Sequence, residues 1–195
     1  MLHSSPLPPR VVVTDYDPRW PTVFADLRAR VAPPLAPITT RIEHVGSTSV
    51  PGLAAKPVID LDIVVRDLIE AERAATVLEA LGYTRLGDLG VPDRYAFRAT
   101  PDLPRHNLYV VIDGSLALRN HLALRDTLRA HPIDAAAYGE LKKRLASQHP
   151  EDVDAYCTAK TEFLLGVLRK AGIPPEYLRE IAIANRVDPR TLGLA

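Results

Sequence analysis

Apolar residues follow two different periods along this chain of 195 residues. Up to about residue 114, short runs in which apolar and polar positions alternate predict β-strands, and segments of helical period lie between them. From about residue 115 onward, apolar residues recur every three to four positions, which predicts helices. The pattern therefore indicates an α/β (α+β) fold, in which a mixed β-sheet with flanking helices precedes a helical C-terminal half.

The boundaries follow from the same pattern and from the prolines and glycines. Strands are expected over Thr40 to Val45, Val58 to Val65, Tyr83 to Leu86, Arg94 to Arg98 and His106 to Ile112. Helices are expected over Asp17 to Val31, Leu68 to Leu81, Leu116 to Ala130, Ile133 to Ser147, Val153 to Lys170 and Pro175 to Asn185. We divide the chain into a flexible N-terminal arm over 1–9, one domain over 10–172 with a sheet part of about 10–114 and a helical part of about 115–172, and a C-terminal helical tail over 173–195.

Two carboxylates lie on the second expected strand. Side chains of a strand alternate between its faces, so Asp60 and Asp62 point to one side, while Ile59, Leu61 and Ile63 point to the other. Two neighbouring carboxylates repel each other unless a positive group lies between them. A hard divalent cation prefers carboxylate oxygens and completes its shell with phosphates and water. The sequence therefore predicts that Asp60 and Asp62 bind Mg²⁺ (or Mn²⁺) and act in catalysis.

A glycine–serine turn precedes this strand. Gly46 and Ser47 close the first strand, and Thr48 and Ser49 follow at the start of a short irregular helix. Such a turn lets the backbone approach a phosphate and donate N–H groups to it. Alone, the serine is equally well an ordinary helix cap, and the paired carboxylates a solvated strand face. Together and in this order, they indicate a phosphate-binding site next to a metal site.

Several cationic side chains are candidates for binding the phosphates of a nucleotide. They are Lys56, Arg94, Arg98, Arg105 and Lys160. An arginine binds phosphate oxygens with two parallel hydrogen bonds, although the arginines of the fourth strand are as well explained by a solvated edge. Lys160 lies on the packed face of its helix, so it either extends to the rim or points into a pocket, and we favour the pocket.

Two histidines are candidates for proton transfer. His106 begins the last strand and would serve as a general base for the acceptor. Glu43 and His44 flank the turn on opposite faces, and we expect His44 to face the site because it shares parity with Gly46. A histidine that is hydrogen-bonded within the core explains His44 equally well.

The amino-acid sequence of the turn and of the strand after it resembles that of a known family. The segment HVGSTSVPGLAAKPVID, residues 44–60, is similar to the hallmark of the GrpB-like (UPF0157) family of bacterial proteins. A Gly-Ser turn followed by an Asp-x-Asp strand also resembles the nucleotidyltransferase superfamily of the polymerase-beta type. The likeness runs from about Val12 to about Leu168 and includes Tyr138 with Lys142 and Tyr156 with Lys160.

The resemblance implies a nucleotidyltransferase-like fold and a Mg²⁺-dependent reaction. The enzyme would transfer a nucleoside monophosphate from a nucleoside triphosphate to a small-molecule or protein acceptor. The sequence departs from the family at Asn107 and Tyr109, where the family pattern has histidines and the superfamily often has a third carboxylate. Two alternatives therefore stay open: a nucleotide-binding module of the same fold with reduced catalysis, and ATP-dependent activation of a carboxylate for amide bond formation.

Charge and composition narrow the class of partners. Lysine plus arginine and aspartate plus glutamate both number 24, so no net field draws the protein to nucleic acid or to a membrane. The expected partners are a nucleotide and an unidentified acceptor. Cys157 cannot form an internal disulfide, and its helical context predicts a small buried side chain. With no signal peptide and no membrane-spanning segment in the sequence, we expect a cytoplasmic protein.

Overall fold

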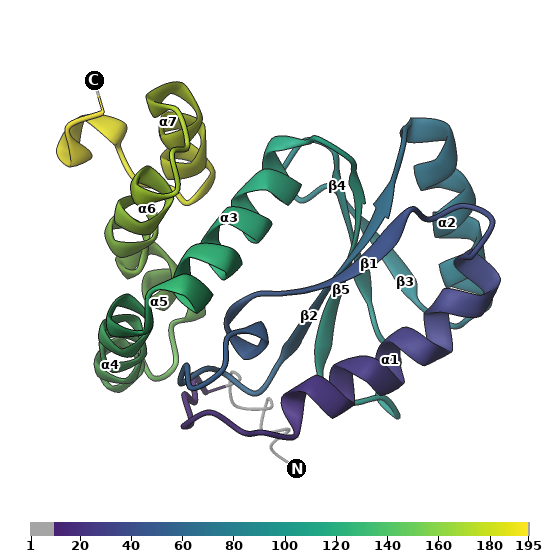
Figure 1. The fold of residues 1–195 in the computed structure, drawn as a ribbon, viewed down its shortest axis with the longest axis horizontal. Coiled ribbons are helices and arrows are strands. Elements are labelled where there is room, and N and C mark those ends of the chain that lie inside the picture. The colour runs from purple at the N-terminus through teal and green to yellow at the C-terminus, as the bar shows by residue number, and fades with distance from the viewer. Residues whose placement is uncertain (1–9, 195) are drawn as a thin grey trace, which may run out of the picture.

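A computed structural model describes residues 10–194, so the expected arm over 1–9 lies outside the described residues. Its centre is a five-stranded sheet of order β1-β2-β5-β4-β3 (Figure 1). The strands are β1 (Arg41–Val45), β2 (Ile59–Val65), β3 (Thr84–Gly87), β4 (Arg94–Arg98) and β5 (His106–Ile112). β2 and β5 are parallel and all other neighbours are antiparallel, which confirms the mixed sheet expected from the sequence.

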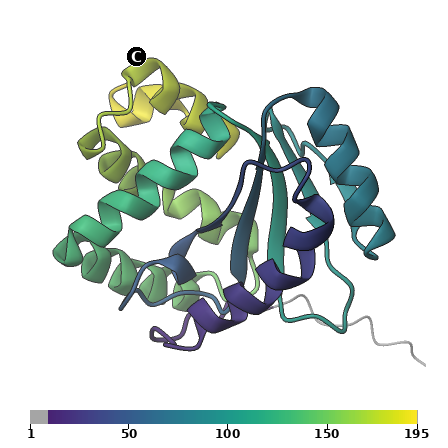
Figure 2. The ribbon, with the colours of Figure 1, turned by 45° about the vertical axis from the view of Figure 1, so that its right-hand side comes forward.

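Helices cover the two sides of the sheet unequally. The helices are α1 (Trp20–Leu35), α2 (Leu68–Ala80), α3 (Leu116–Ala130), α4 (Pro132–Gln148), α5 (Val153–Ala159), α6 (Thr161–Lys170) and α7 (Pro175–Ala184), with 3-10 turns η1 (Ser47–Ser49) and η2 (Pro189–Leu192). α1 and α2 lie on one side of the sheet, and α3 to α7 gather on the other (Figures 1 and 2). None of the described helices is both long and apolar enough to span a membrane.

The side of the sheet under α1 and α2, here called the core face, holds the main hydrophobic core. Ile63 of β2 and Val110 of β5 are fully buried there against Val31 of α1 and Leu78 of α2. The alternation of apolar and polar positions along β2 places Asp60 on the opposite side, here called the site face. One strand therefore contributes both to the core and to the candidate site.

Local signals in the sequence fix the ends of several helices. The side chain of Asp67 accepts a hydrogen bond from the backbone N–H of Glu70 and caps α2, and Ser115 caps α3 in the same way. Gly82 follows α2 with a φ of 92°, a conformation that a glycine adopts without strain. These ends lie within one or two residues of the positions expected from the sequence.

Three local expectations are wrong. The segment Val153 to Lys170 forms two helices, because α5 ends at Ala159 and α6 begins at Thr161, with Lys160 in a turn between them. α1 continues through Pro33 and Pro34 to Leu35, whose side chain is buried in the core. Cys157 is exposed rather than buried, since the apolar period of the expected single helix does not continue through the break.

The C-terminal segment packs on the rest of the helical half. Leu178 and Ala182 of α7 are buried against Leu165 and Leu168 of α6. A helix that buries such residues contributes to the stability of the neighbouring elements. The segment after residue 172 is therefore joined to the domain through a shared core.

We expect Leu178→Ala to lower the free energy of unfolding by about 2–4 kcal/mol, because it removes a buried side chain and leaves a cavity. Ile183→Ala on the same helix is the matched control, because Ile183 is 63% exposed, and its effect should stay within about 0.5 kcal/mol. Urea denaturation measures both. Equal effects of the two substitutions would contradict an integral packing of α7.

Candidate active site

The turn after β1 brings the backbone of Gly46 against the carboxylate of Asp60. Gly46 has a φ of 67°, and a methyl group added to it would lie 2.0 Å from Oδ2 of Asp60. The hydroxyl of Ser49 donates a hydrogen bond of 2.6 Å to the carbonyl of Gly46 and closes the turn. No side chain fits between this turn and the carboxylate, so the position requires glycine.

Asp60 has a polar neighbour on the next strand. Asn107 is its partner in the β2–β5 register, and Nδ2 of Asn107 donates a hydrogen bond of 2.7 Å to Oδ1 of Asp60. Burial raises the pKa of Asp60, and the hydrogen bond from Asn107 and the charge of His121 oppose that shift. A bound cation near Asp60 would stabilise its ionised form further.

Asp62 lies deeper on the same face and is 0% exposed. Nδ1 of His121, from α3, lies 2.7 Å from Oδ2 of Asp62. Burial disfavours a charged His121, but the charge and the hydrogen bond of Asp62 outweigh it, and the pKa of His121 is raised. Oδ1 of Asp62 is buried and has no hydrogen-bond partner among the described residues.

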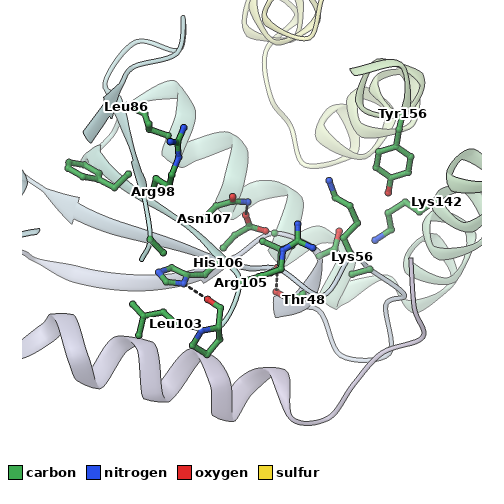
Figure 3. A pocket seen from close by; sticks show the side chains of 18 of the residues that line it. Thr48, Lys56, Leu86, Arg98, Leu103, Arg105, His106, Asn107, Lys142 and Tyr156 are labelled. Carbon is green, nitrogen blue, oxygen red and sulfur yellow. Dashed lines mark hydrogen bonds between the residues drawn. The ribbon is translucent and has the colours of Figure 1, made fainter. Parts of the chain in front are cut away.

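Asp60 lines a cavity of about 690 Å³. Figure 3 shows this cavity, with Asn107 and Lys142 among the side chains around it. One wall is the Gly46–Thr48 turn with Asp60, and the facing wall comes from the helical half. That wall carries Tyr138, Lys142, Tyr156 and Lys160, and Lys56 lies beside it. The two halves of the chain meet at this cavity.

Three lysines face the turn, and none of them has an ion pair with a described residue. Nζ of Lys142 lies 4.4 Å from the ring centroid of Tyr138, and Nζ of Lys160 lies 4.5 Å from that of Tyr156. Lys142 is only 2% exposed, and its Nζ has no hydrogen-bond partner within 10–194. Burial, followed by the charge of Lys160, lowers the pKa of Lys142 to about 6. An anion in the cavity would therefore find amines that lack a partner.

The three arginine candidates separate in the structure. Arg98 and Arg105 line the cavity. Arg94 does not line it: its guanidinium lies 4.6 Å from the ring centroid of Tyr109, and its Nε is buried without a described partner. Arg94 is kept from the cavity because it lies two side-chain rows further along the sheet than Arg98.

Thr48 lines the cavity, and the backbone of Ser49 connects the turn to α3. The hydroxyl of Thr48 lies 3.1 Å from Nε2 of His44, and the carbonyl of Ser49 accepts two hydrogen bonds from Arg129 of α3, at 2.7 and 3.0 Å. Arg125 donates a further bond of 3.2 Å to the carbonyl of His44. α3 therefore holds the turn in place.

Glu43 and His44 lie on opposite faces of β1 as expected, but the expectation that His44 faces the site is wrong. Glu43 is the register partner of Asp62 and shares the site face, whereas His44 pairs with Leu61 and stacks on Phe24 of α1 with ring centroids 4.5 Å apart. The alternation of side chains along β1 does not extend to Gly46, because the positive φ of Gly46 ends the strand geometry. The side on which Gly46 lies therefore does not indicate the side on which His44 lies. Glu43 is an acid beside Asp62, but its carboxylate is already paired with Arg125 at 2.7 Å.

The ring of His106 does not join the carboxylates. His106 is the register partner of Ile59, which places its side chain on the core face. Its Nε2 lies 3.0 Å from the hydroxyl of Tyr83, its Nδ1 lies 2.7 Å from the carbonyl of Pro104, and burial lowers its pKa. The structure thus gives His106 two partners and brings it to the cavity wall without directing it at Asp60.

Sequence reasoning missed several residues that shape the site. They are Tyr138, Lys142 and Tyr156 on the lysine wall and His121, Arg125 and Arg129 on α3. A lysine amid apolar helical positions was the available signal, and it singled out Lys160 but not Lys142. The positions on α3 follow only from the packing of the helical half against β2.

The residues present fit a Mg²⁺ ion that is shared with phosphates. No three His, Cys, Asp or Glu side chains between residues 10 and 194 gather as a metal cage. Mg²⁺, however, is commonly bound by one or two carboxylates together with substrate phosphates and water. Asp60 lines the cavity, whereas Asp62 lies on the same face of β2 outside the cavity lining, with a buried Oδ1 that has no partner among the described residues. Those two side chains are the candidate ligands.

The profile of the family described as GrpB protein matches residues 10–170. The chain belongs to the GrpB protein family. A crystal structure of the conserved protein GrpB from Enterococcus faecalis shares 34% identity with this GrpB-family chain, covering 82% of it and 96% of the crystallised chain, with a TM-score of 0.75. The mixed sheet and its helices therefore belong to the family fold.

Two further matches show how far the similarity to known proteins extends. The UPF0157 protein YqkA of Bacillus subtilis is 36% identical over 155 residues, which are 80% of this GrpB-family chain and 45% of YqkA. The chain thus spans less than half of that relative. A terminal uridylyl transferase 4 from Trypanosoma brucei with bound UTP is 18% identical over 90% of this chain and 58% of its own, with a TM-score of 0.46. That likeness is too low to argue from.

We expect Gly46→Ala to destabilise the protein more than Gly52→Ala, by at least about 1 kcal/mol. Both glycines have positive φ, but a methyl group at Gly52 meets nothing within 4 Å, whereas one at Gly46 meets Asp60. In an Asp60→Ala background, the difference between the two substitutions should shrink. Urea denaturation of the single and double variants measures it, and an unchanged difference would show that Asp60 is not the obstacle.

We expect the native protein to become more stable as the pH rises from 6.5 to 9, a range above the lowered pKa of Lys142 of about 6. Lys142→Met should make this rise in the free energy of unfolding smaller. In that window the unfolded chain binds a proton at Lys142 that the folded chain does not, so the free energy of unfolding of the native protein rises by up to about 1.4 kcal/mol per pH unit. Urea denaturation across this range tests it. Lys143→Met is the control, because Lys143 is exposed and paired with Asp15 at 2.8 Å, and an equal effect there would contradict the assignment.

Proposed function

We propose that this protein binds a Mg²⁺-associated nucleoside triphosphate in the cavity and transfers its nucleoside monophosphate to a small-molecule or protein acceptor. The observation that carries the proposal is the position of the Gly46–Ser47 turn and Asp60 opposite three lysines that have no carboxylate partner among the described residues. The turn offers backbone N–H groups, and the lysines offer positive charge to the same anion.

The wall of the cavity that carries Lys142 and Lys160, with Lys56 beside it, here called the lysine wall, can bind a triphosphate. Lys56, Lys142 and Lys160 approach the cavity from the side of the helical half, and the rings of Tyr138 and Tyr156 lie under their ammonium groups. These amines would bind the β- and γ-phosphates and stabilise the pyrophosphate as it leaves. Such a site works chiefly by positioning and by neutralising charge.

The carboxylates suit the metal. Asp60 and Asp62 would hold Mg²⁺, which in such a site supplies charge neutralisation at the phosphoryl oxygens. In the transfer step, the acceptor oxygen or nitrogen forms a bond to the α-phosphorus, the bond from that phosphorus to the bridging oxygen of pyrophosphate breaks, and the proton of the acceptor goes to water. The His121 contact fixes the side chain of Asp62 through Oδ2 and leaves its Oδ1 without a partner among the described residues.

One observation favours a second candidate, a nucleotide-binding module with reduced catalysis. On β5, the site face presents Asn107 and Tyr109 where a third acid would deprotonate the acceptor, and Glu43 is paired with Arg125. Burial also raises the pKa of Tyr109 to about 12, so this phenol stays protonated. The two candidates share the binding site and differ in turnover.

Isothermal titration calorimetry with ATP, GTP, CTP and UTP, with and without Mg²⁺, tests the nucleotide site. We expect a metal-dependent affinity that falls by about tenfold or more in Lys160→Met, because a charge-assisted contact to phosphate is lost. Lys143→Met on the neighbouring helix α4 is the matched control, since Lys143 lies outside the cavity. No binding of any nucleotide by the native protein, or equal loss in both variants, would refute the proposal.

Pyrophosphate release in the presence of Mg²⁺ separates the two candidates. Transfer predicts release that Asp60→Asn abolishes, since this nearly isosteric change removes the charge that holds the metal. Asp26→Asn, at an exposed position of α1 outside the cavity lining, should leave the release unchanged. Nucleotide binding without release that depends on Asp60 would establish the binding module instead.

A further inference from the structure

Two arginines in the cavity have no partner. The side chains of Arg98 and Arg105 line it, and neither forms a hydrogen bond or an ion pair with any described residue. Guanidinium groups match the geometry of carboxylates and phosphates with paired N–H donors. Two such groups without partners in one cavity indicate a place for an anion.

Arg98 lies away from the lysine wall. In the β4–β5 register Phe97 pairs with Leu108, so Arg98 comes beside Asn107, which in turn pairs with Asp60 on β2. With neighbouring strands about 4.8 Å apart, the backbone of Arg98 lies about 10 Å from that of Asp60. Figure 3 shows Arg98 at one end of the cavity and Lys142 at the other, with Asn107 between them.

Arg105 lies nearer to the middle of the cavity. It directly precedes β5, and Figure 3 shows its side chain in the cavity between Asn107 and Lys56. Arg98 and Arg105 thus flank Asn107, which binds Asp60. An anionic group held between these arginines would lie beside the carboxylate that we assign to the metal.

The positive charges of the cavity are spread over both of its ends. Its described lining has one carboxylate, Asp60, and four cations besides Lys142: Lys56, Arg98, Arg105 and Lys160. A triphosphate bound at the lysine wall would leave Arg98, at the other end of the cavity, without an anionic partner among the described residues. Electrostatic complementarity then calls for a second negative group in the cavity.

We propose that the acceptor is itself an anion, a small molecule with a phosphate or carboxylate group that Arg98 and Arg105 bind and a hydroxyl or amine that reaches the α-phosphate. This inference rests on the proposed function and names the class of its second substrate. The lysine wall takes the triphosphate, and the arginine end takes the acceptor.

The test uses the protein saturated with Mg²⁺ and α,β-methylene ATP, which resists transfer. Calorimetric titration at constant ionic strength compares glycerol 3-phosphate, glycerate and uncharged glycerol. We expect a charged probe to bind and glycerol not to bind, and the two charged probes distinguish phosphate from carboxylate. Arg98→Met should weaken the charged probe by about tenfold or more, while nucleotide affinity stays within about twofold of the native value.

Arg119→Met is the matched control, because Arg119 is an exposed arginine of α3 outside the cavity lining. The inference is overturned if neither charged probe binds the loaded protein, if glycerol binds equally well, or if Arg98→Met weakens the nucleotide rather than the probe. In those outcomes nucleotide binding by the native protein still stands. Failure of the nucleotide itself to bind would refute the proposed function instead.

Discussion

The carboxylate of Asp62 is wholly buried on an interior strand, and a buried charge needs a partner. His121 provides that partner from α3, at 2.7 Å. The same helix supplies Arg125 and Arg129, which bond to the carbonyls of the turn after β1. Compensation of one buried charge therefore fixes α3 against the sheet and, with it, the turn on which the candidate site depends.

The two faces of the sheet have different roles, because successive side chains of β2 point to opposite faces. Leu61 and Ile63 bury apolar surface under α1 and α2, which stabilises the fold, while Asp60 faces a cavity that the helical half completes. Lys142 shows what this arrangement costs, since a buried amine without a partner opposes folding at neutral pH. Such groups are concentrated at functional sites because a ligand can supply the missing partner.

Much of the fold could be predicted from local sequence. The strands and most helix boundaries follow from alternation and caps, as at Arg94–Arg98 and Leu116–Ala130, where expectation and structure coincide. The pairing of Asp60 with the Gly46 turn was also predictable, because both lie within one strand–turn–strand unit. These features are set by residues that are close together in the sequence, which is why they could be predicted.

The rest depended on contacts between distant segments. Lys142 and His121 lie about 80 and 60 residues from the strand that they serve, and no local period indicates which helix face meets the sheet. His44 was assigned to the wrong face because a turn with positive φ breaks the parity of the strand. The break at Lys160 was missed because both flanking helices share the apolar composition of one long helix.

A crystal structure of the protein with Mg²⁺ and α,β-methylene ATP tests the central claim most directly. The account predicts a triphosphate between the Gly46–Ser47 turn and the amines of Lys142 and Lys160, with the metal on Asp60. A nucleotide bound outside this cavity, or one whose phosphates contact neither the turn nor the lysines, would contradict it.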